Sequence, residues 1–336
     1  MKPLPILAAV VCAFFLLSSF ATPQATKPPD RQVAITIDDL PAGMADRLPA
    51  ADITAMTTKL LTTLRDQNVP VVGFVNEKKL YKAGEVDERI KVLEMWLDYG
   101  FELGNHTFSH ASLNQVGLRA WEDDVIQGES VTKLLLAQHK MKLRYFRHPY
   151  LDTGRDLETR REAEAFLVER GYRIAPITLD GWDWMFAGVY EDAKKRNDTA
   201  LQQQIVKEYL AYHDAVFAYC EQLSARIVGY EPKQILLLHA SSLEADHIGE
   251  LLDVLRKRGY SFITLHDALS DSAYSLPDTY VGEEGTGWIE HWAISQGRIP
   301  QGEPIFPQWV IDRAKQLHLS TGTVPPPTPD GPPTPQ

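Results

Sequence analysis

The chain has 336 residues, of which 44% are hydrophobic, so it can bury the core of one large domain or two smaller ones. Its formal net charge of −11 argues against a nucleic-acid partner, because nucleic-acid binding requires a basic face. The chain contains two cysteines, Cys12 and Cys220, which excludes a disulfide framework and a cysteine-based zinc site.

The N-terminal stretch has the pattern of an export signal. Lys2 precedes an apolar run at 6–17, and small residues follow that run. We therefore expect a signal peptide at 1–21 and an exported protein, either periplasmic or secreted. The alternative is an uncleaved anchor, which would be the protein's only membrane contact. The apolar run is short for a membrane span, which needs about 20 residues.

Strand-like and helix-like patterns alternate over the next part of the chain. Apolar runs predict strands at 33–40, 69–75, 101–105, 143–146, 172–179, 234–238 and 260–264. Helical spacing predicts helices at 53–64, 87–99, 118–138, 156–170, 199–227 and 246–258. Such alternation indicates parallel βαβ units in a barrel or an open sheet. The chain has no glycine-rich motif for a dinucleotide or a nucleotide phosphate.

The chain divides into four parts on this basis. After the signal peptide we expect a catalytic domain at 31–270. An extension at 271–320 carries tryptophan, glycine and proline, and we expect it to wrap the barrel as irregular structure. The end at 321–336 is rich in proline and is expected to be disordered.

Polar clusters end most of the predicted strands. Asp38 and Asp39 end the first strand, and His239 ends the sixth. The other clusters are 106–110, 147–150 and 180–184. In a parallel barrel the carboxyl ends of the strands share one face, so these clusters are expected to meet there. Two adjacent carboxylates could also be only a turn or a helix cap. If buried, they would cost several kcal/mol without a metal, an arginine or water to compensate.

The pair His106 and His110 can present two imidazoles on one face of a helical turn. One carboxylate from Asp38 or Asp39 would complete a site of two histidines and one aspartate, with positions left open for water. Such a donor set binds zinc or another divalent first-row metal.

The chain resembles the polysaccharide deacetylase family, which includes chitin, chitooligosaccharide and peptidoglycan deacetylases and some acetylxylan esterases. The resemblance covers about residues 31–268 and rests on five motifs in the family's order. These motifs are Thr36-Ile37-Asp38-Asp39, His106-Thr107-x-x-His110, Arg147-x-Pro149-Tyr150, Asp180-x-x-x-Trp184 and Leu237-x-His239. The resemblance implies a distorted (β/α)7 barrel.

The resemblance also implies a role for each motif residue. Asp39, His106 and His110 would hold a divalent metal, zinc first, with cobalt, nickel or iron as alternatives. Asp38 would be the general base toward the attacking water, and His239 would protonate the departing amine.

By the same resemblance, Arg147 would pair with Asp38, and Asp180 would orient His239. The backbone N–H of Tyr150 would stabilise the oxyanion. Trp184 would shape the acetyl pocket beside His239.

Other residues near the motifs allow further interpretations. Trp182, Phe186 and Tyr190 form either a platform for stacking sugars or ordinary loop packing. His148 lies inside the third motif and is interpreted as a residue of the pocket rim. The segments 185–233 and 270–320 are long enough to build a wall over a groove.

These residues together predict a metal-dependent hydrolase that removes acetyl groups, N-acetyl first, from a carbohydrate polymer or oligomer. One alternative is an O-acetyl esterase acting on xylan-like glycans. Another is a non-catalytic glycan-binding protein with the same fold. Two histidines and one aspartate also occur in non-haem iron oxygenases, but the usual His-x-Asp spacing of that class is absent here.

Overall fold

A computed structural model describes residues 30–319 of the protein. The expected signal peptide at 1–21 and the proline-rich tail at 321–336 lie outside the described residues. Among the helices of the described part, none is both long enough and apolar enough to span a membrane.

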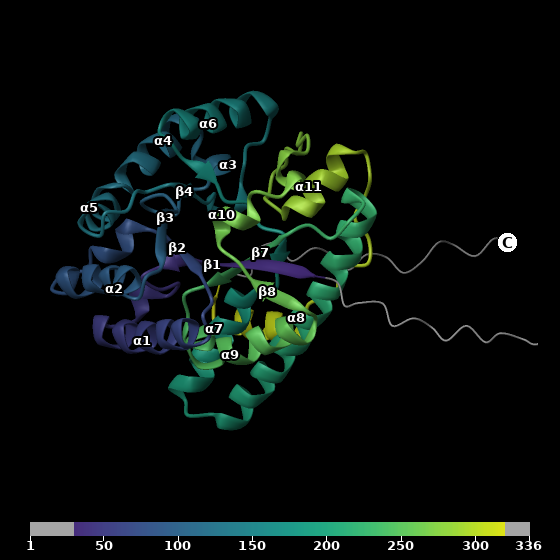
Figure 1. Ribbon diagram of the computed structural model, residues 1–336. Helices are drawn as coiled ribbons and strands as arrows, with labels where there is room; N and C mark the ends of the chain where they lie inside the picture. Colours follow the sequence, from purple (N-terminus) through teal and green to yellow (C-terminus); the bar gives the residue numbers. More distant parts are fainter. Residues whose placement is uncertain (1–29, 320–336) are drawn as a thin grey trace, which may run out of the picture.

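All strand pairs of the sheet are parallel. The strands are β1 (Arg31–Leu40), β2 (Val71–Val75), β3 (Glu102–Asn105), β4 (Tyr145–Phe146), β5 (Arg173–Ile174), β6 (Leu179–Asp180), β7 (Gln234–His239) and β8 (Tyr260–Phe262). Seven strands follow the order β5-β4-β3-β2-β1-β7-β6, and β8 pairs with β1 outside this path. The strands curl, and helices surround them (Figure 1). The expectation of a distorted (β/α)7 barrel is confirmed.

The helices fill the connections between strands and continue after the last strand. They are α1 (Ala50–Asp66), α2 (Val86–Asp98), α3 (Leu113–Val116), α4 (Leu118–Gln127), α5 (Ser130–Gln138), α6 (Leu157–Glu169), α7 (Asp183–Lys195), α8 (Thr199–Val228), α9 (Ser242–Lys257), α10 (Leu265–Ala268), α11 (Trp288–Ser295) and α12 (Gln308–Gln316). Short 3-10 turns occupy Ala45–Arg47, Glu77–Leu80, Pro149–Leu151 and Ser272–Ser275.

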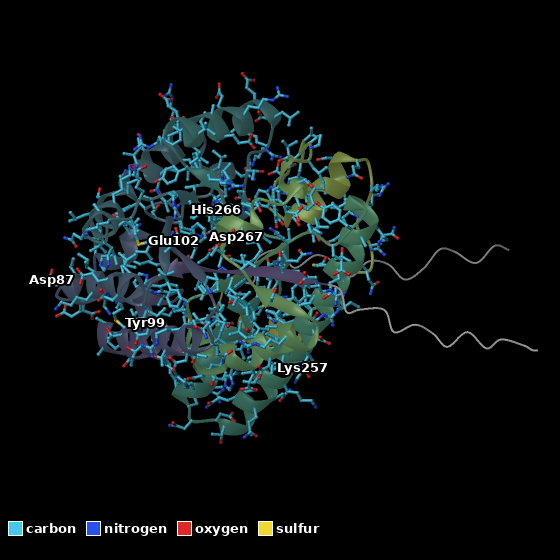
Figure 2. All side chains as sticks on the ribbon, in the orientation of Figure 1. Asp87, Tyr99, Glu102, Lys257, His266 and Asp267 are labelled. Atoms are coloured by element: carbon cyan, nitrogen blue, oxygen red, sulfur yellow. The ribbon has the colours of Figure 1, made fainter. Side chains whose placement is uncertain are left out.

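Strand β1 is buried on both faces, as expected for a strand inside a parallel sheet. Val33, Ala34 and Ile37 have no exposed surface. Charged side chains lie on the outside of the molecule instead, for example Asp87 at the start of α2 and Lys257 at the end of α9 (Figure 2).

The register of the central strands brings two of the predicted site residues together. Strands β1 and β7 pair residue by residue from Val33 with Gln234 to Asp38 with His239. The two predicted proton-transfer residues are therefore neighbours across the sheet. The pairing of β1 with β2 is irregular between Ile37 and Leu40. Asp39 lies in this irregularity with a φ of 71°, which turns the chain direction directly after Asp38.

Three of the expected elements differ in the structure. The helix predicted at 118–138 is divided into α4 and α5 around Gly128. At Gly128 the chain passes very close to the backbone of Thr107 and Phe108, and a Cβ there would lie only 2.8 Å from these backbone atoms. The strand predicted at 172–179 is divided into β5 and β6, and Pro176 between them cannot donate a ladder hydrogen bond.

The third difference concerns the extension, which contains helices α11 and α12 where the sequence indicated irregular structure. Helix α11 packs against α8, and α12 packs against α7 (Figure 1). The residues of α11 are apolar around most of the helix, which hides the helical period in the sequence.

Gly181 provides a stability prediction for the loop between β6 and α7. A Cβ at this position would overlap the imidazole of His213, which is fully buried and held by a 2.9 Å hydrogen bond to the carbonyl of Tyr209. We expect Gly181→Ala to lower the free energy of unfolding by about 1–3 kcal/mol because of this overpacking. Urea denaturation measures the effect. The matched variant Gly249→Ala, inside α9, should leave stability unchanged or raise it, since the added Cβ would meet only the end of a flexible Gln67 side chain at 3.2 Å and the methyl group of Thr63 at an ordinary contact distance of 3.7 Å.

Candidate metal and catalytic site

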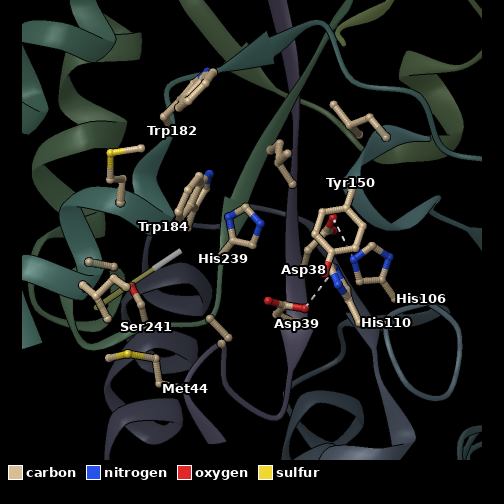
Figure 3. A pocket seen from close by; sticks show the side chains of 18 of the residues that line it. Asp38, Asp39, Met44, His106, His110, Tyr150, Trp182, Trp184, His239 and Ser241 are labelled. Atoms are coloured by element: carbon tan, nitrogen blue, oxygen red, sulfur yellow. Dashed lines mark ion pairs between the residues drawn. The ribbon is translucent and has the colours of Figure 1, made fainter. Parts of the chain in front are cut away.

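A pocket with a volume of about 970 Å³ lies at the carboxyl ends of the strands. Nine of the ten predicted site residues line it: Asp38, Asp39, His106, His110, Tyr150, Asp180, Trp182, Trp184 and His239 (Figure 3). The tenth, Arg147, is completely buried behind Asp38. The barrel topology therefore brings the clusters that end separate strands to one cavity.

Asp39, His106 and His110 form a candidate metal centre. One potential ligand atom from each residue lies within 4.8 Å of the others. The Nδ1 atom of His106 lies 2.8 Å from the carbonyl oxygen of Arg147 and donates a hydrogen bond to it, which leaves Nε2 free to face the pocket. Nε2 of His110 lies 3.6 Å from Oδ1 of Asp39.

The electrostatics of this cluster fit a metal. Burial lowers the pKa of His110 to about 4 and the pKa of His106 well below its usual value, so both imidazoles are neutral. Burial alone would raise the pKa of Asp39, but Lys79 and the nearby histidines hold it well below its usual range. Oδ1 of Asp39 is buried and accepts no well-oriented hydrogen bond. A carboxylate and two neutral imidazoles are in the protonation states that metal binding requires.

Lys79 is a site residue that the sequence analysis did not find. It lies in the 3-10 turn Glu77–Leu80 after β2, and its Nζ atom is 2.9 Å from Oδ1 of Asp39. A sequence signal for this residue existed, because the polar residues 76–79 directly follow the second predicted strand. We had assigned no polar cluster to the end of that strand. The ammonium shares an oxygen with the candidate metal centre, so it should repel a bound cation.

We expect Lys79→Met to raise the affinity for zinc about tenfold, because it removes a positive charge beside the ligands at nearly constant side-chain length. Competition with a chromophoric chelator measures the dissociation constant. Lys78→Met serves as the control, since Lys78 is an exposed neighbour. An unchanged affinity in Lys79→Met would show that the lysine moves away when metal binds.

Asp38 and Arg147 form a buried ion pair next to the candidate metal centre. Nη1 of Arg147 lies 3.2 Å from Oδ2 of Asp38, and Nη2 donates to Oγ1 of Thr36 over 2.9 Å. Burial raises the pKa of Asp38 to about 6, although Arg147 and His239 oppose this rise. Asp38 is therefore ionised at neutral pH and still basic enough to accept a proton.

His239 has a different carboxylate partner from the predicted one. Nδ1 of His239 lies 2.8 Å from Oδ1 of Asp183, and the backbone N–H of His239 donates to Oδ2 of Asp183 over 2.6 Å. The contact that we assigned to Asp180 is thus made by Asp183. The carboxylate of Asp180 instead accepts the backbone N–H of Trp182 over 2.9 Å.

The reason lies in the local backbone of this loop. Trp182 adopts a left-handed conformation with a φ of 53°, and helix α7 begins at Asp183. Asp183 is completely buried beneath His239, whereas Asp180 remains partly exposed to the cavities beside it. The two aspartates in the run 180–183 looked equivalent in the sequence.

Trp182 and Trp184 are half-buried in the pocket wall, and their rings stack with centroids 6.2 Å apart. Figure 3 shows Trp184 beside His239, as predicted. The stacking platform does not extend further, because Phe186 and Tyr190 are buried in the core. Tyr150 is 57% exposed, and its ring meets that of His110 at 4.4 Å, so it forms the opposite side of the pocket.

His148 lines the pocket, as the rim interpretation implied, but it lies in the buried wall and not at an exposed edge. Its side chain is 2% exposed and stacks on Trp121 with the ring planes 6° apart. Burial lowers its pKa to about 3, so the ring is neutral. Pro149 follows His148 and begins a short 3-10 turn, and the next residue, Tyr150, also lines the pocket.

Unusual backbone conformations gather at this site. Half of the ten non-glycine residues with positive φ in the described part of the chain line the pocket. They are Asp39, His110, Tyr150, Leu151 and Trp182. Such conformations cost free energy and are typical of functional sites, where side chains must take positions that regular structure does not offer.

The two long segments after the fourth motif contribute to the walls of the pocket. Helix α7 supplies Ala187 and Glu191, and the extension supplies Glu283 and Leu319. Both segments therefore line the pocket, which we call the groove. This arrangement agrees with the wall that the lengths of these segments indicated.

Comparison with known proteins shows to which proteins this chain is similar. Residues 25–173 match the family described as polysaccharide deacetylase. This part of the chain is similar to that family. A peptidoglycan-N-acetylglucosamine deacetylase from Bacillus cereus is 26% identical over 166 residues, which cover 49% of this chain and 50% of that protein. The chain thus spans about half the length of this curated relative.

Solved structures of low sequence identity also match. A family 4 carbohydrate esterase from Streptomyces lividans in complex with acetate is 19% identical, with a TM-score of 0.44 over 71% of this chain and 96% of that one. A pseudoenzyme of the same family from Bacillus anthracis is 17% identical, with a TM-score of 0.45 over 72% of this chain and 66% of that one. The polysaccharide deacetylase Bc1974 from Bacillus cereus is 16% identical, with a TM-score of 0.46 over 70% and 91%.

Proposed function

We propose that this protein is an exported hydrolase that removes N-acetyl groups from the amino sugars of a glycan. The observation that carries the proposal is the placement of Asp38 and His239 on paired positions of β1 and β7, beside the cluster of Asp39, His106 and His110. These five residues would supply a general base, a general acid and three metal ligands in one part of the groove. The family match and the relative that acts on N-acetylglucosamine in peptidoglycan support the choice of substrate.

The proposed division of labour follows from the chemistry of an amide. Asp39, His106 and His110 would hold a divalent ion, preferably zinc given the donor set. Such an ion supplies a Lewis acid that polarises the acetyl carbonyl and lowers the pKa of water. Asp38 removes the proton from the attacking water, and Arg147 holds the Asp38 carboxylate in place through the 3.2 Å ion pair.

His239 then donates a proton to the departing amine. An amine is a poor leaving group unless it is protonated, so the acid must keep its proton at neutral pH. Burial alone would lower the pKa of His239, but Asp183 and the charges of Asp39 and Asp38 raise it to about 10. A histidine of this kind suits an N-acetyl substrate.

The test is acetate release by the zinc-loaded protein from chitooligosaccharides, peptidoglycan and acetylxylan, with free amine measured in parallel. The proposal expects acetate and amine to appear in equal amounts from a substrate with N-acetyl groups. Acetate without amine, from acetylxylan, would replace it with the O-acetyl esterase. Binding of a glycan without any acetate release would favour the non-catalytic glycan-binding protein.

A further inference from the structure

A second, smaller cavity adjoins the catalytic groove. Its volume is about 320 Å³, and it lies between the end of β6, helix α8 and the start of α11. Leu151, Asp180 and Trp182 line both this cavity and the groove, so the two spaces share a wall. A substrate with more than one sugar could place one unit in each space. The volume is at the low end of the range of about 300–1,000 Å³ found for small-molecule sites.

Acidic side chains line the second cavity. Asp180, Glu290 and Glu303 line it, and none of the three forms an ion pair within residues 30–319. The described residues that line it include no lysine, arginine or histidine. Burial raises the pKa of Glu290 to about 8, and the charges of Glu303 and Asp180 contribute to this rise. A cation bound in this cavity would lower the pKa of Glu290 and favour its ionised form.

An independent observation on helix α8 also indicates a polar ligand. The side chain of Tyr219 is 8% exposed and lines the cavity, and its hydroxyl has no hydrogen-bond partner among the described residues. The hydroxyl oxygen itself is not fully buried, so it can hydrogen-bond to a ligand in the cavity. The aromatic rings of Trp182 and Tyr280 complete the wall and offer faces that suit both a sugar ring and a cation.

The spacing of the carboxylates argues for a large cation over a metal ion. Within the part of the chain that the structure describes, the cluster with close enough ligand atoms for one metal is that of Asp39, His106 and His110. The carboxylates of the second cavity do not meet this criterion. An organic ammonium suits them better, because it donates up to three hydrogen bonds to acceptors that lie several ångströms apart.

We infer that the second cavity binds a sugar unit with a free ammonium group, next to the acetylated unit in the groove. This inference rests on the proposed function and specifies its substrate as a partly deacetylated glycan. An N-acetyl unit is neutral and gains nothing from the carboxylates, whereas a deacetylated unit gains charge-assisted hydrogen bonds to Glu290 and Glu303. The enzyme would then prefer acetyl groups that neighbour an amine.

The first test measures binding and does not depend on catalysis. Calorimetric titration of the full chain with glucosamine should show saturable binding, and titration with N-acetylglucosamine under the same conditions should show affinity about tenfold weaker. The double variant Glu290→Gln and Glu303→Gln should lose this difference, and Tyr219→Phe should reduce it. Glu162→Gln, an exposed carboxylate on α6, is the matched control and should behave as the wild type.

The second test measures specificity with disaccharides of defined acetylation. The wild type should have a kcat/KM about tenfold higher for the better of the two mono-acetylated disaccharides than for the doubly acetylated one. The ratio should approach one in the double variant and keep its wild-type value in the control Glu162→Gln. Lack of acetate release with intact glucosamine binding would reject the proposed function and leave the second cavity as an amine site. Equal glucosamine affinity in the wild type and the double variant would overturn the inference, as would displacement of glucosamine by stoichiometric calcium.

Discussion

Replacement of Asp38 by Asn is expected to lower the deacetylation rate about 10²–10⁴-fold while zinc stays bound. Asparagine has nearly the same shape as aspartate but cannot accept a proton from the attacking water. The proposed ligands Asp39, His106 and His110 are unchanged in this variant. Acetate release gives the rate, and metal analysis of the purified variant gives the zinc content.

The ion pair with Arg147 complicates this variant. Asp38 is 2% exposed and Arg147 is completely buried, so Asp38→Asn leaves a buried guanidinium without its counter-charge. Removal of one partner of a buried pair is strongly destabilising, so the melting temperature should fall. If the rate fell only because the variant unfolds, zinc and the circular dichroism signal would be lost as well.

The companion variant Asp38→Glu separates catalysis from stability. Glutamate keeps the negative charge opposite Arg147 but shifts the carboxylate by one methylene. We expect a folded, zinc-bound protein whose activity is still greatly reduced, because a general base must lie within hydrogen-bond distance of the proton that it removes. Full activity in either variant would exclude Asp38 as the base and direct attention to another acceptor in the groove.

The sequence predicted the parts of this site that follow from strand topology. A parallel barrel brings the ends of all its strands to one face, so Asp38, His106 and His239 had to meet once their strands were recognised. The register of β1 with β7 then makes Asp38 and His239 direct neighbours. The same reasoning placed Arg147 at this face after β4, but its ion pair with Asp38 was predicted only from the family resemblance.

The parts that the sequence did not predict depend on local backbone conformation. Lys79 approaches Asp39 because the chain forms a 3-10 turn at 77–80, which has no strong sequence signal. His148 lies in the buried wall of the pocket, directly before the short 3-10 turn that contains the left-handed Tyr150. The charge in the second cavity arises from Glu290 and Glu303 of the extension, whose packing on the barrel has no periodic pattern.

The carboxylate partner of His239 is the clearest residue that the sequence did not predict. Its replacement is expected to have the second large effect on activity. In Asp183→Asn, the carboxylate that lies 2.8 Å from Nδ1 of His239 is replaced by a neutral amide. We expect kcat at pH 8 to fall about 10²-fold, because His239 loses both its orientation and much of the charge that keeps it protonated. The variant should still bind zinc, since Asp183 does not belong to the metal cluster.

The pH profile provides a signature that a purely structural effect would not produce. Burial would lower the pKa of His239, but Asp183, Asp39 and Asp38 raise it to about 10 in the wild type. His239 must be protonated to donate, so activity is lost as the pH rises through this pKa. Without the charge of Asp183 the pKa of His239 falls, and the alkaline limb of the kcat profile moves to lower pH.

Asp180→Asn is the matched control for this experiment, since it makes the same chemical change three residues earlier in the same loop. Its carboxylate accepts the backbone N–H of Trp182 and makes no hydrogen bond to His239. The alkaline limb should therefore move less in Asp180→Asn than in Asp183→Asn. A larger shift in Asp180→Asn would restore the assignment made from the sequence and show that the histidine changes partner when substrate and metal occupy the groove.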